Sequence, residues 1–327
     1  MADISELREQ LIDRRSRLET AASRVDSADD LVGLIRSVDE ALHRLEAGSF
    51  GSCLACRETV DEQALLDAPL LEYCLCHLTS EQQEALQRDL DLASKTQRAL
   101  LPKQDLTASG WRVHYRYIPA GPVSGDYCDF WVPGGDSGPL FFILGDVSGK
   151  GVAASFLMAR LHSMFRTLVD TGSPLQDLVA RANRLFGENK VPAQYATLVC
   201  GRAEADGRVA ICNAGHPPPM IATKEEVRSV EATGLPVGLF TTGPYSVYRT
   251  TLSVGDSLLL FTDGLTETRD ATGHEFGRDR VLSVLRARSD DPPEVLASAY
   301  LGEVKKFSGG GGAADDLTLM VVRRHTD

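Results

Sequence analysis

Hydrophobic and polar residues are patterned differently in the first third of the chain and in the rest. Residues 3–23 and 31–47 show no strand-like alternation and are rich in Leu, Arg, Glu and Ala, which predicts two helices with a break near Val25. A capping pattern at Thr79 opens a third helical segment, and Pro102 is expected to end it. The N-terminal third is therefore expected to be helical.

The third helix, expected over residues 80–101, carries a narrow apolar stripe with the polar Gln97 at one of its positions. The spacing of four, three and seven residues along the stripe is typical of a short coiled-coil seam, which favours pairing with the same helix of a second chain in a homodimer. The alternative is that the stripe packs permanently against its own chain. The apolar members are Leu86, Leu90, Ala93 and Leu100.

Beyond Trp111 the pattern changes to short β-rich segments separated by helical stretches. Short connections such as Ala205-Asp206-Gly207 favour hairpins, so we expect an α+β domain with antiparallel sheets and outer helices rather than a doubly wound parallel sheet. The expected strands are 112–119, 127–133, 139–147, 195–203, 207–214, 217–222, 257–262 and 316–323, and the expected helices are 151–170, 174–188, 277–288 and 292–306.

Composition and charge narrow the classes of function. The chain has 327 residues, of which 43% are hydrophobic and 24% charged, as is ordinary for a globular protein. The net charge is -12, and residues 1–100 hold 11 basic and 20 acidic side chains, which argues against nucleic acid as a partner. No apolar run approaches the roughly 20 residues of a membrane span, and the first residues do not resemble a signal peptide. We therefore expect a cytoplasmic protein without a membrane partner.

Aspartates recur in the second part of the chain where strands are expected to end. Asp126 lies in a Ser-Gly-Asp-Tyr sequence and Asp146 in Gly-Asp-Val-Ser-Gly. Asp263 and Asp316 adjoin strongly apolar strands. Hard divalent cations prefer oxygen ligands, and converging carboxylates would hold two metals about 3.5–4 Å apart, an arrangement that activates water for attack on phosphorus. A single Asp-Gly pair is a common turn, but four such clusters together favour a metal site.

Six short motifs follow one another in this part of the chain. They are Ser124-Gly125-Asp126-Tyr127-Cys128-Asp129-Phe130, Gly145-Asp146-Val147-Ser148-Gly149-Lys150-Gly151, Asn213-Ala214-Gly215-His216-Pro217-Pro218, Gly234-Leu235-Pro236-Val237-Gly238, Thr262-Asp263-Gly264-Leu265-Thr266-Glu267 and Asp315-Asp316-Leu317-Thr318. In this order they resemble the motifs of the sporulation stage II protein E branch of the metal-dependent protein phosphatases. The resemblance covers roughly residues 90–324 and implies an αββα sandwich.

The resemblance also implies an activity and roles for individual residues. The activity is hydrolysis of phosphoserine or phosphothreonine at two manganese or magnesium ions, without a cysteine nucleophile. Asp126 and Asp146 would bridge or flank the metals, and the Val147 carbonyl would complete the coordination. Asp263 and Asp316 would be the remaining carboxylate ligands. Two further carboxylates are expected just behind the ligands, Asp129 and Asp315.

Three other side chains near these motifs have two interpretations each. Cys128 lacks the loop of a thiol phosphatase and is expected to have no catalytic role. His216 is a candidate general acid, but a turn fixed by the prolines that follow it favours a structural role. Lys150 is equally compatible with contact to a phosphate and with a solvated loop position.

A cysteine cluster in the first third of the chain predicts a structural zinc site. Cys53 and Cys56 are separated by two residues, and pairing Cys74 with His77 gives a second knuckle of the same spacing. Cys76 competes with His77 for the fourth place. The alternative is a set of buried reduced cysteines. Four ligands without a vacancy would stabilise a small module that has little core of its own.

The stretch from Val38 to His77 resembles the zinc finger of the DksA/TraR family of RNA-polymerase-binding regulators. That family usually shows four cysteines, so the histidine is a departure from its pattern. The resemblance implies RNA polymerase as a possible partner, and Asp26 and Asp29 lie at the break between the first two predicted helices, where the family can carry an acidic tip. A sensing or dimerising module that regulates a phosphatase is the favoured interpretation.

These expectations define three regions and two functions. Residues 1–78 are expected to hold the helices and the zinc finger, residues 79–105 a helical linker, and residues 106–327 the phosphatase domain. By resemblance, the favoured function is dephosphorylation of a regulatory protein in a partner-switching pathway, such as an anti-sigma-factor antagonist. The alternatives are a regulator that binds the transcription machinery through a vestigial phosphatase fold, and a phosphatase of small phosphoesters.

Overall fold

The structure is a computed structural model that describes residues 8, 11–12, 15–16, 18–19, 29–60, 65, 70, 72, 80–135, 138–188, 194–240, 243–310 and 315–325. The chain forms two compact units, Met1–Arg88 and Asp89–Asp327, and the boundary falls within helix α4 (Ser80–Leu100).

The first unit contains helix α2 (Asp29–Glu46), close to the second predicted helix. Val38 and Ala41 lie one helical turn apart on α2 and are buried with Leu11 in a small apolar cluster. The first predicted helix, over residues 3–23, falls largely outside the described residues, and those of its residues that are described are helical.

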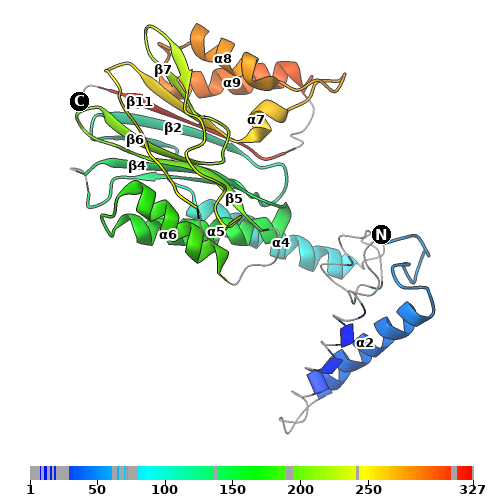
Figure 1. The fold of residues 1–327 in the computed structure, drawn as a ribbon. Helices are drawn as coiled ribbons and strands as arrows, with labels where there is room; N and C mark the ends of the chain where they lie inside the picture. Colours follow the sequence, from blue (N-terminus) through cyan, green and yellow to red (C-terminus); the bar gives the residue numbers. More distant parts are fainter. Residues whose placement is uncertain are drawn as a thin grey trace. The chain divides into compact units, whose positions relative to one another are not determined.

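The second unit contains two antiparallel sheets that face each other (Figure 1). One sheet has the strand order β1-β2-β11-β10-β7-β8 and the other the order β3-β4-β5-β6-β9. Helices α8 and α9 lie on the outer side of the first sheet, and α5 and α6 on the outer side of the second (Figure 1). Its elements are β1 (Asp105–Ala108), β2 (Trp111–Ile118), β3 (Tyr127–Trp131), β4 (Leu140–Val147), α5 (Gly151–Val169), α6 (Leu175–Gly187), β5 (Ala196–Ala203), β6 (Arg208–Ala214), β7 (Met220–Ala222), β8 (Val227–Ser229), β9 (Tyr248–Thr251), β10 (Ser257–Phe261), α7 (Asp263–Glu267), α8 (Gly277–Ala287), α9 (Pro293–Phe307) and β11 (Leu317–Arg324).

Strand β4 shows why the central strands have no hydrophobic alternation in the sequence. Phe142 and Leu144 face the other sheet and belong to the core between the sheets. Phe141 and Ile143 face the opposite way and pack in the core beneath α5 and α6. A strand that is buried on both faces is apolar at every position, so it appears in the sequence as a continuous apolar run.

All eight strands and four helices that the sequence predicts after residue 106 are confirmed within a few residues. Strand β1 was missed because its polar and apolar residues alternate over only four positions, too few to give a clear strand pattern. It forms a hairpin with β2 through Ser109 and Gly110, both with positive φ (53° and 73°). Strands β8 and β9 and helix α7 were also missed. None of the helices in the described part of the chain has the length and apolarity that crossing a membrane requires.

Candidate metal centre

The four aspartates predicted as metal ligands lie at one end of the paired sheets. Asp126 precedes β3 and Asp146 is near the end of the neighbouring strand β4. Asp263 follows β10, and Asp316 precedes the neighbouring strand β11. Each sheet therefore supplies two carboxylates, and contacts across the sandwich bring the two pairs together.

Asp126 is held by hydroxyl groups from the opposite sheet. Its carboxylate is 1% exposed, and its Oδ2 accepts hydrogen bonds from Thr262 Oγ1, at 3.1 Å, and from Thr318 Oγ1. Burial, followed by the negative charge of Asp146, raises the pKa of Asp126 well above its usual range. The sequence analysis assigned no role to either threonine, although each lies within two residues of a predicted ligand.

Asp316 fixes the loop that carries Asp126. Its Oδ1 accepts the backbone N–H of Ala120 at 2.7 Å, and its Oδ2 accepts that of Gly125 at 3.0 Å. A Cβ atom on Gly125 would lie 3.1 Å from the Val147 carbonyl oxygen and 3.3 Å from Asp146 Oδ1. The loop therefore passes close to two of the predicted metal-binding groups, and glycine makes this approach possible.

The carboxylates at this end repel one another. Burial, followed by the charges of Asp263, Asp315 and Asp316, raises the pKa of Asp146 to about 7. Burial and the charge of Asp315 likewise raise the pKa of Asp263. Lys150 Nζ forms an exposed ion pair with Asp315 Oδ2 at 3.0 Å, so it offsets only part of this negative charge.

A divalent cation fits the chemistry of these groups. All are oxygen donors, which manganese and magnesium prefer, and their mutual repulsion is relieved when a cation binds between them. Within the described residues, no three His, Cys, Asp or Glu side chains are already arranged to hold a metal ion.

Asp129, which is expected just behind the ligands, connects β3 with α5. Both of its oxygens accept hydrogen bonds from the Arg166 guanidinium, at 2.7 Å each. Arg166 also stacks on Trp131, with 4.1 Å between its Cζ atom and the ring centroid. His162 Nε2 lies 3.6 Å from Asp129 Oδ2. This half-buried ion pair links β3 to the helix that begins just after the Asp146 loop.

His216 and Cys128 are both buried. Burial lowers the pKa of His216 to about 3, so the imidazole is neutral at pH 7, and its Nδ1 lies 2.9 Å from Thr197 Oγ1. This favours the structural interpretation of His216 over the general acid. Burial raises the pKa of the Cys128 thiol, which agrees with a residue that takes no part in catalysis.

Helix α4 makes direct contact with the loop of Asp126. Gln97 is 7% exposed, its Nε2 donates a hydrogen bond to the Ser124 carbonyl at 2.6 Å, and its Oε1 accepts the Ser124 N–H at 3.0 Å. Ser124 Oγ in turn accepts the Asp126 N–H at 3.0 Å. Gln97, the polar residue in the predicted seam, therefore packs against the second unit of its own chain. The sequence pattern did not indicate Ser124 as its partner.

The cysteines of the predicted zinc site are described only in part. Cys53 and Cys56 lie in a tight turn in which the Cys53 N–H donates to the Glu58 carbonyl and the Arg57 N–H to the Cys53 carbonyl. The Leu54 N–H donates to the carbonyl of Glu72 at 2.9 Å, which brings the chain back to this turn just before the second knuckle of the sequence. Cys74, Cys76 and His77 lie outside the described residues.

Comparison with known proteins places these features in a family. The profile of the family described as Stage II sporulation protein E matches residues 136–325. The chain is 27% identical to Protein IcfG of Synechocystis over 72% of its own length but spans only 42% of that relative. It is 25% identical to the phosphoserine phosphatase RsbU of Bacillus subtilis over 74% of the chain and 72% of RsbU.

A solved structure supports the same fold. The SiaA-PP2C domain of Pseudomonas aeruginosa matches with a TM-score of 0.65 at 19% identity, over 75% of this chain and 99% of that domain. At this identity the likeness shows the fold alone, a mixed α and β architecture of the PP2C type.

Proposed function

Because the chain belongs to the Stage II sporulation protein E family, we propose that it is a metal-dependent protein serine/threonine phosphatase. The observation that carries the proposal is the group of buried, mutually repelling carboxylates that both sheets supply at one end of the sandwich. Asp126, Asp146, Asp263 and Asp316, with the Val147 carbonyl, are the proposed ligands of two manganese or magnesium ions.

The residues around the proposed ligands hold them in place for this chemistry. Two bound divalent cations would lower the pKa of water and neutralise charge on the phosphoryl oxygens. Thr262 and Thr318 orient Asp126, and Asp316 orients the Gly125 amide. Because these contacts cross between the sheets, the packing of the sandwich determines the geometry of the ligands.

The proposed substrate is a phosphorylated regulatory protein of a partner-switching pathway, such as an anti-sigma-factor antagonist. The resemblance of the six motifs and the phosphoserine phosphatase activity named for RsbU support this class. A phosphoserine peptide and a set of sugar phosphates, assayed side by side with manganese, separate a protein phosphatase from a phosphatase of small esters.

We further propose that residues 79–105 act as a regulatory linker between a module at residues 1–78 and a phosphatase domain at residues 106–327. The hydrogen bonds between Gln97 and Ser124 support this role, because a shift of α4 would alter the loop that carries Asp126. The exposed Leu86 leaves part of the predicted homodimer seam available to a second chain.

A structural zinc ion in the first unit remains part of the proposal. The turn that holds Cys53 and Cys56 has the tight backbone of a metal knuckle, and Cys74 with either His77 or Cys76 would complete four ligands. A DksA/TraR-like finger in this position would transmit a signal to the linker, whereas contact with RNA polymerase is the less favoured use.

The proposed activity is tested with manganese and a phosphoserine peptide. We expect hydrolysis that a chelator abolishes, and a loss of more than about 100-fold in Asp146→Asn and Asp263→Asn, because each substitution removes one proposed ligand. Circular dichroism should show an intact fold in both variants. The exposed Asp290→Asn is the matched control and should retain full activity.

Undiminished turnover with chelator, or in both ligand variants, contradicts the proposal. A chain that is inactive with manganese would favour a vestigial phosphatase fold.

A further inference from the structure

The outer face of the second sheet carries two arginines beside the residues of its core. Cys200 on β5 pairs in register with Cys212 on β6, and both are buried in the core beneath α5 and α6. Two residues further along, Arg202 pairs with Ala210, and Ala210 pairs with Arg249 on β9. Directly paired residues project from the same face of an antiparallel sheet, so the two arginines stand on either side of Ala210.

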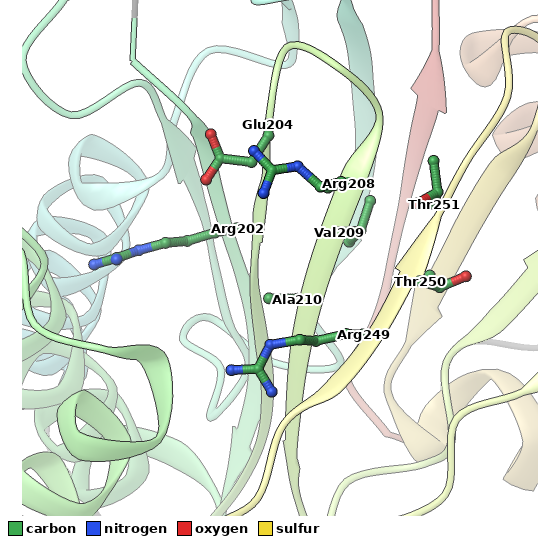
Figure 2. Close-up of a pocket in the computed structure, with 8 residues that line it drawn as sticks. All are labelled: Arg202, Glu204, Arg208, Val209, Ala210, Arg249, Thr250 and Thr251. Atoms are coloured by element: carbon green, nitrogen blue, oxygen red, sulfur yellow. The ribbon is translucent and has the colours of Figure 1, made fainter.

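These residues line a pocket of about 360 Å³ (Figure 2). A third arginine in it, Arg208, is paired with Asp206 through its Nε at 2.7 Å. Across the part of the chain that the structure describes, the guanidinium groups of Arg202 and Arg249 make no ion pair. Glu204 is the one acidic residue among those that line the pocket. The pocket therefore presents two guanidinium groups without an ion pair, on either side of a small side chain, and its lining carries more positive than negative charge.

The pocket continues along the surface at Arg202. A second pocket, of about 530 Å³, is also lined by Arg202, together with Pro133, Pro139, Val169 and Asp170. The two pockets share Arg202, and the second adds apolar side chains and one exposed carboxylate, Asp170, so a peptide segment suits this surface better than a single ion.

The arginines are remote from the candidate metal centre. Asp146 pairs with Thr197 on β5, and Arg202 lies five residues further along this strand. At about 3.3 Å per residue the separation is roughly 17 Å, too far for contact with a phosphoryl group at the carboxylates. A partner that reaches both places must be a macromolecule.

We propose that Arg202 and Arg249 form a docking site for an acidic segment of the phosphoprotein substrate. The partner's identity as the substrate rests on the function proposed above. A chain of net charge -12 repels acidic proteins over most of its surface, and two free guanidinium groups attract a carboxylate with bidentate geometry. Contacts far from the reacting atoms also give selectivity that a site for a common phosphoryl group lacks.

Direct binding tests the site without any activity. The probe is a fluorescein-labelled hexaglutamate peptide, and the readout is fluorescence anisotropy at about 50 mM and about 300 mM salt. We expect salt-sensitive binding that weakens about five-fold or more in Arg202→Gln/Arg249→Gln. The matched control, Arg286→Gln/Lys305→Gln, changes the net charge equally at exposed positions on α8 and α9 and should bind like the unmutated chain. Equal binding by the two double variants overturns the proposal.

Kinetics test the link to the substrate. The substrates are two phosphoserine peptides that end in either six glutamates or six glutamines. A Gly-Ser linker of about 12 residues joins the phosphoserine to this end, and its root-mean-square span of about 19 Å matches the distance between the metal centre and Arg202. In the unmutated chain and in the control variant, we expect KM to be about five-fold lower for the glutamate peptide than for the glutamine peptide, with the same kcat. In Arg202→Gln/Arg249→Gln, we expect the two peptides to have the same KM.

The outcomes of these experiments separate the two proposals. An advantage of the glutamate peptide that persists in the arginine variant overturns the docking site. Failure to hydrolyse either peptide with manganese overturns the proposed function, and the anisotropy measurement still decides whether the arginines bind an acidic segment. If the arginine variant changes the oligomeric state by light scattering and leaves peptide binding unchanged, the surface is an interface between copies and the docking proposal is wrong.

Discussion

At the scale of single residues, the candidate metal centre combines burial with like charge. Asp126 is almost fully buried, and two threonine hydroxyls donate to one of its oxygens. These hydroxyls stabilise the carboxylate without neutralising it, which leaves negative charge for a cation. The two threonines therefore belong to the candidate site, because they hold the Asp126 carboxylate in place.

The raised pKa of Asp146, about 7, predicts how metal and pH act on stability. A carboxyl group whose pKa is higher in the folded state binds protons more tightly there than in the unfolded chain. It therefore stabilises the metal-free fold below about pH 4, and this contribution is lost as the pH rises to about 7. We expect the melting temperature without metal to fall over this range and the stabilisation by manganese to grow, because metal binding displaces the proton.

The comparison that isolates this group is Asp146→Asn. Without metal, the variant should melt at nearly the same temperature as the unmutated chain at about pH 5 and at a higher temperature at about pH 8, because asparagine removes the charge repulsion. Differential scanning calorimetry without and with manganese measures both effects. A difference in melting temperature between the two proteins that does not change with pH would falsify the assignment of the raised pKa to Asp146.

At the scale of elements, the two ends of helix α4 differ in their surroundings. Gln97 is buried and Leu100 packs against the core beneath α5 and α6. Leu86 and Leu92 are 44% and 64% exposed. The C-terminal turns of the helix therefore dock on the phosphatase unit, as one of the two interpretations of its stripe requires, and the N-terminal turns keep exposed apolar residues.

The contact between Gln97 and Ser124 is expected to position the loop of the metal centre. In Gln97→Leu, the Ser124 N–H and carbonyl both lose a partner, at a cost of about 1–3 kcal/mol in the free energy of unfolding. We expect weaker manganese binding by calorimetric titration and faster hydrogen exchange at the amides of residues 124–126. Arg98→Gln, an exposed substitution on the same helix, is the control. Equal effects in both variants would show that the hydrogen bonds do not position the loop.

The exposed turns of α4 are expected to pair with a second chain. Because the apolar residues Leu86 and Leu90 lie one turn apart, a charge at either position should weaken a short coiled coil. We expect Leu86→Asp and Leu90→Asp to shift a dimer towards monomer in light scattering and to change turnover of a protein substrate, with manganese binding unaffected. A monomeric unmutated chain at every accessible concentration rules out the pairing.

At the scale of the whole molecule, the two compact units differ in how they are stabilised. The phosphatase unit has three extensive apolar clusters, one between the sheets and one beneath each helix pair. The described part of the first unit has two small clusters, one of them around Cys53 and Val60. A small module with little core needs a further source of stability, which the proposed zinc ion would supply.

The zinc prediction follows from this difference. We expect one zinc per chain by elemental analysis, lost in Cys53→Ser and Cys74→Ser, because each substitution removes one of four proposed ligands. Thermal unfolding should then show a loss of the first unit's transition, while hydrolysis of a small substrate is largely retained. Protein purified without chelator that contains no zinc would contradict the prediction.

Much of the fold followed from the sequence because its signals are local. The apolar run at Phe141–Leu144 predicts a strand, and the helices near it follow from their residue types and breakers. Short elements such as β8 and β9 were missed because three or four half-exposed residues carry no clear period. Their strand structure depends on neighbours that are distant in the sequence.

The sequence alone determined which carboxylates are candidates for a metal centre, because their positions at strand ends and the order of the motifs can be read along the chain. Only the tertiary structure decided what surrounds them. Thr318 reaches Asp126 across the sandwich, Gln97 reaches Ser124 from helix α4, and Arg202 and Arg249 both lie beside Ala210. Such contacts join residues far apart in sequence, and they arise only when the sheets pair in register and pack face to face.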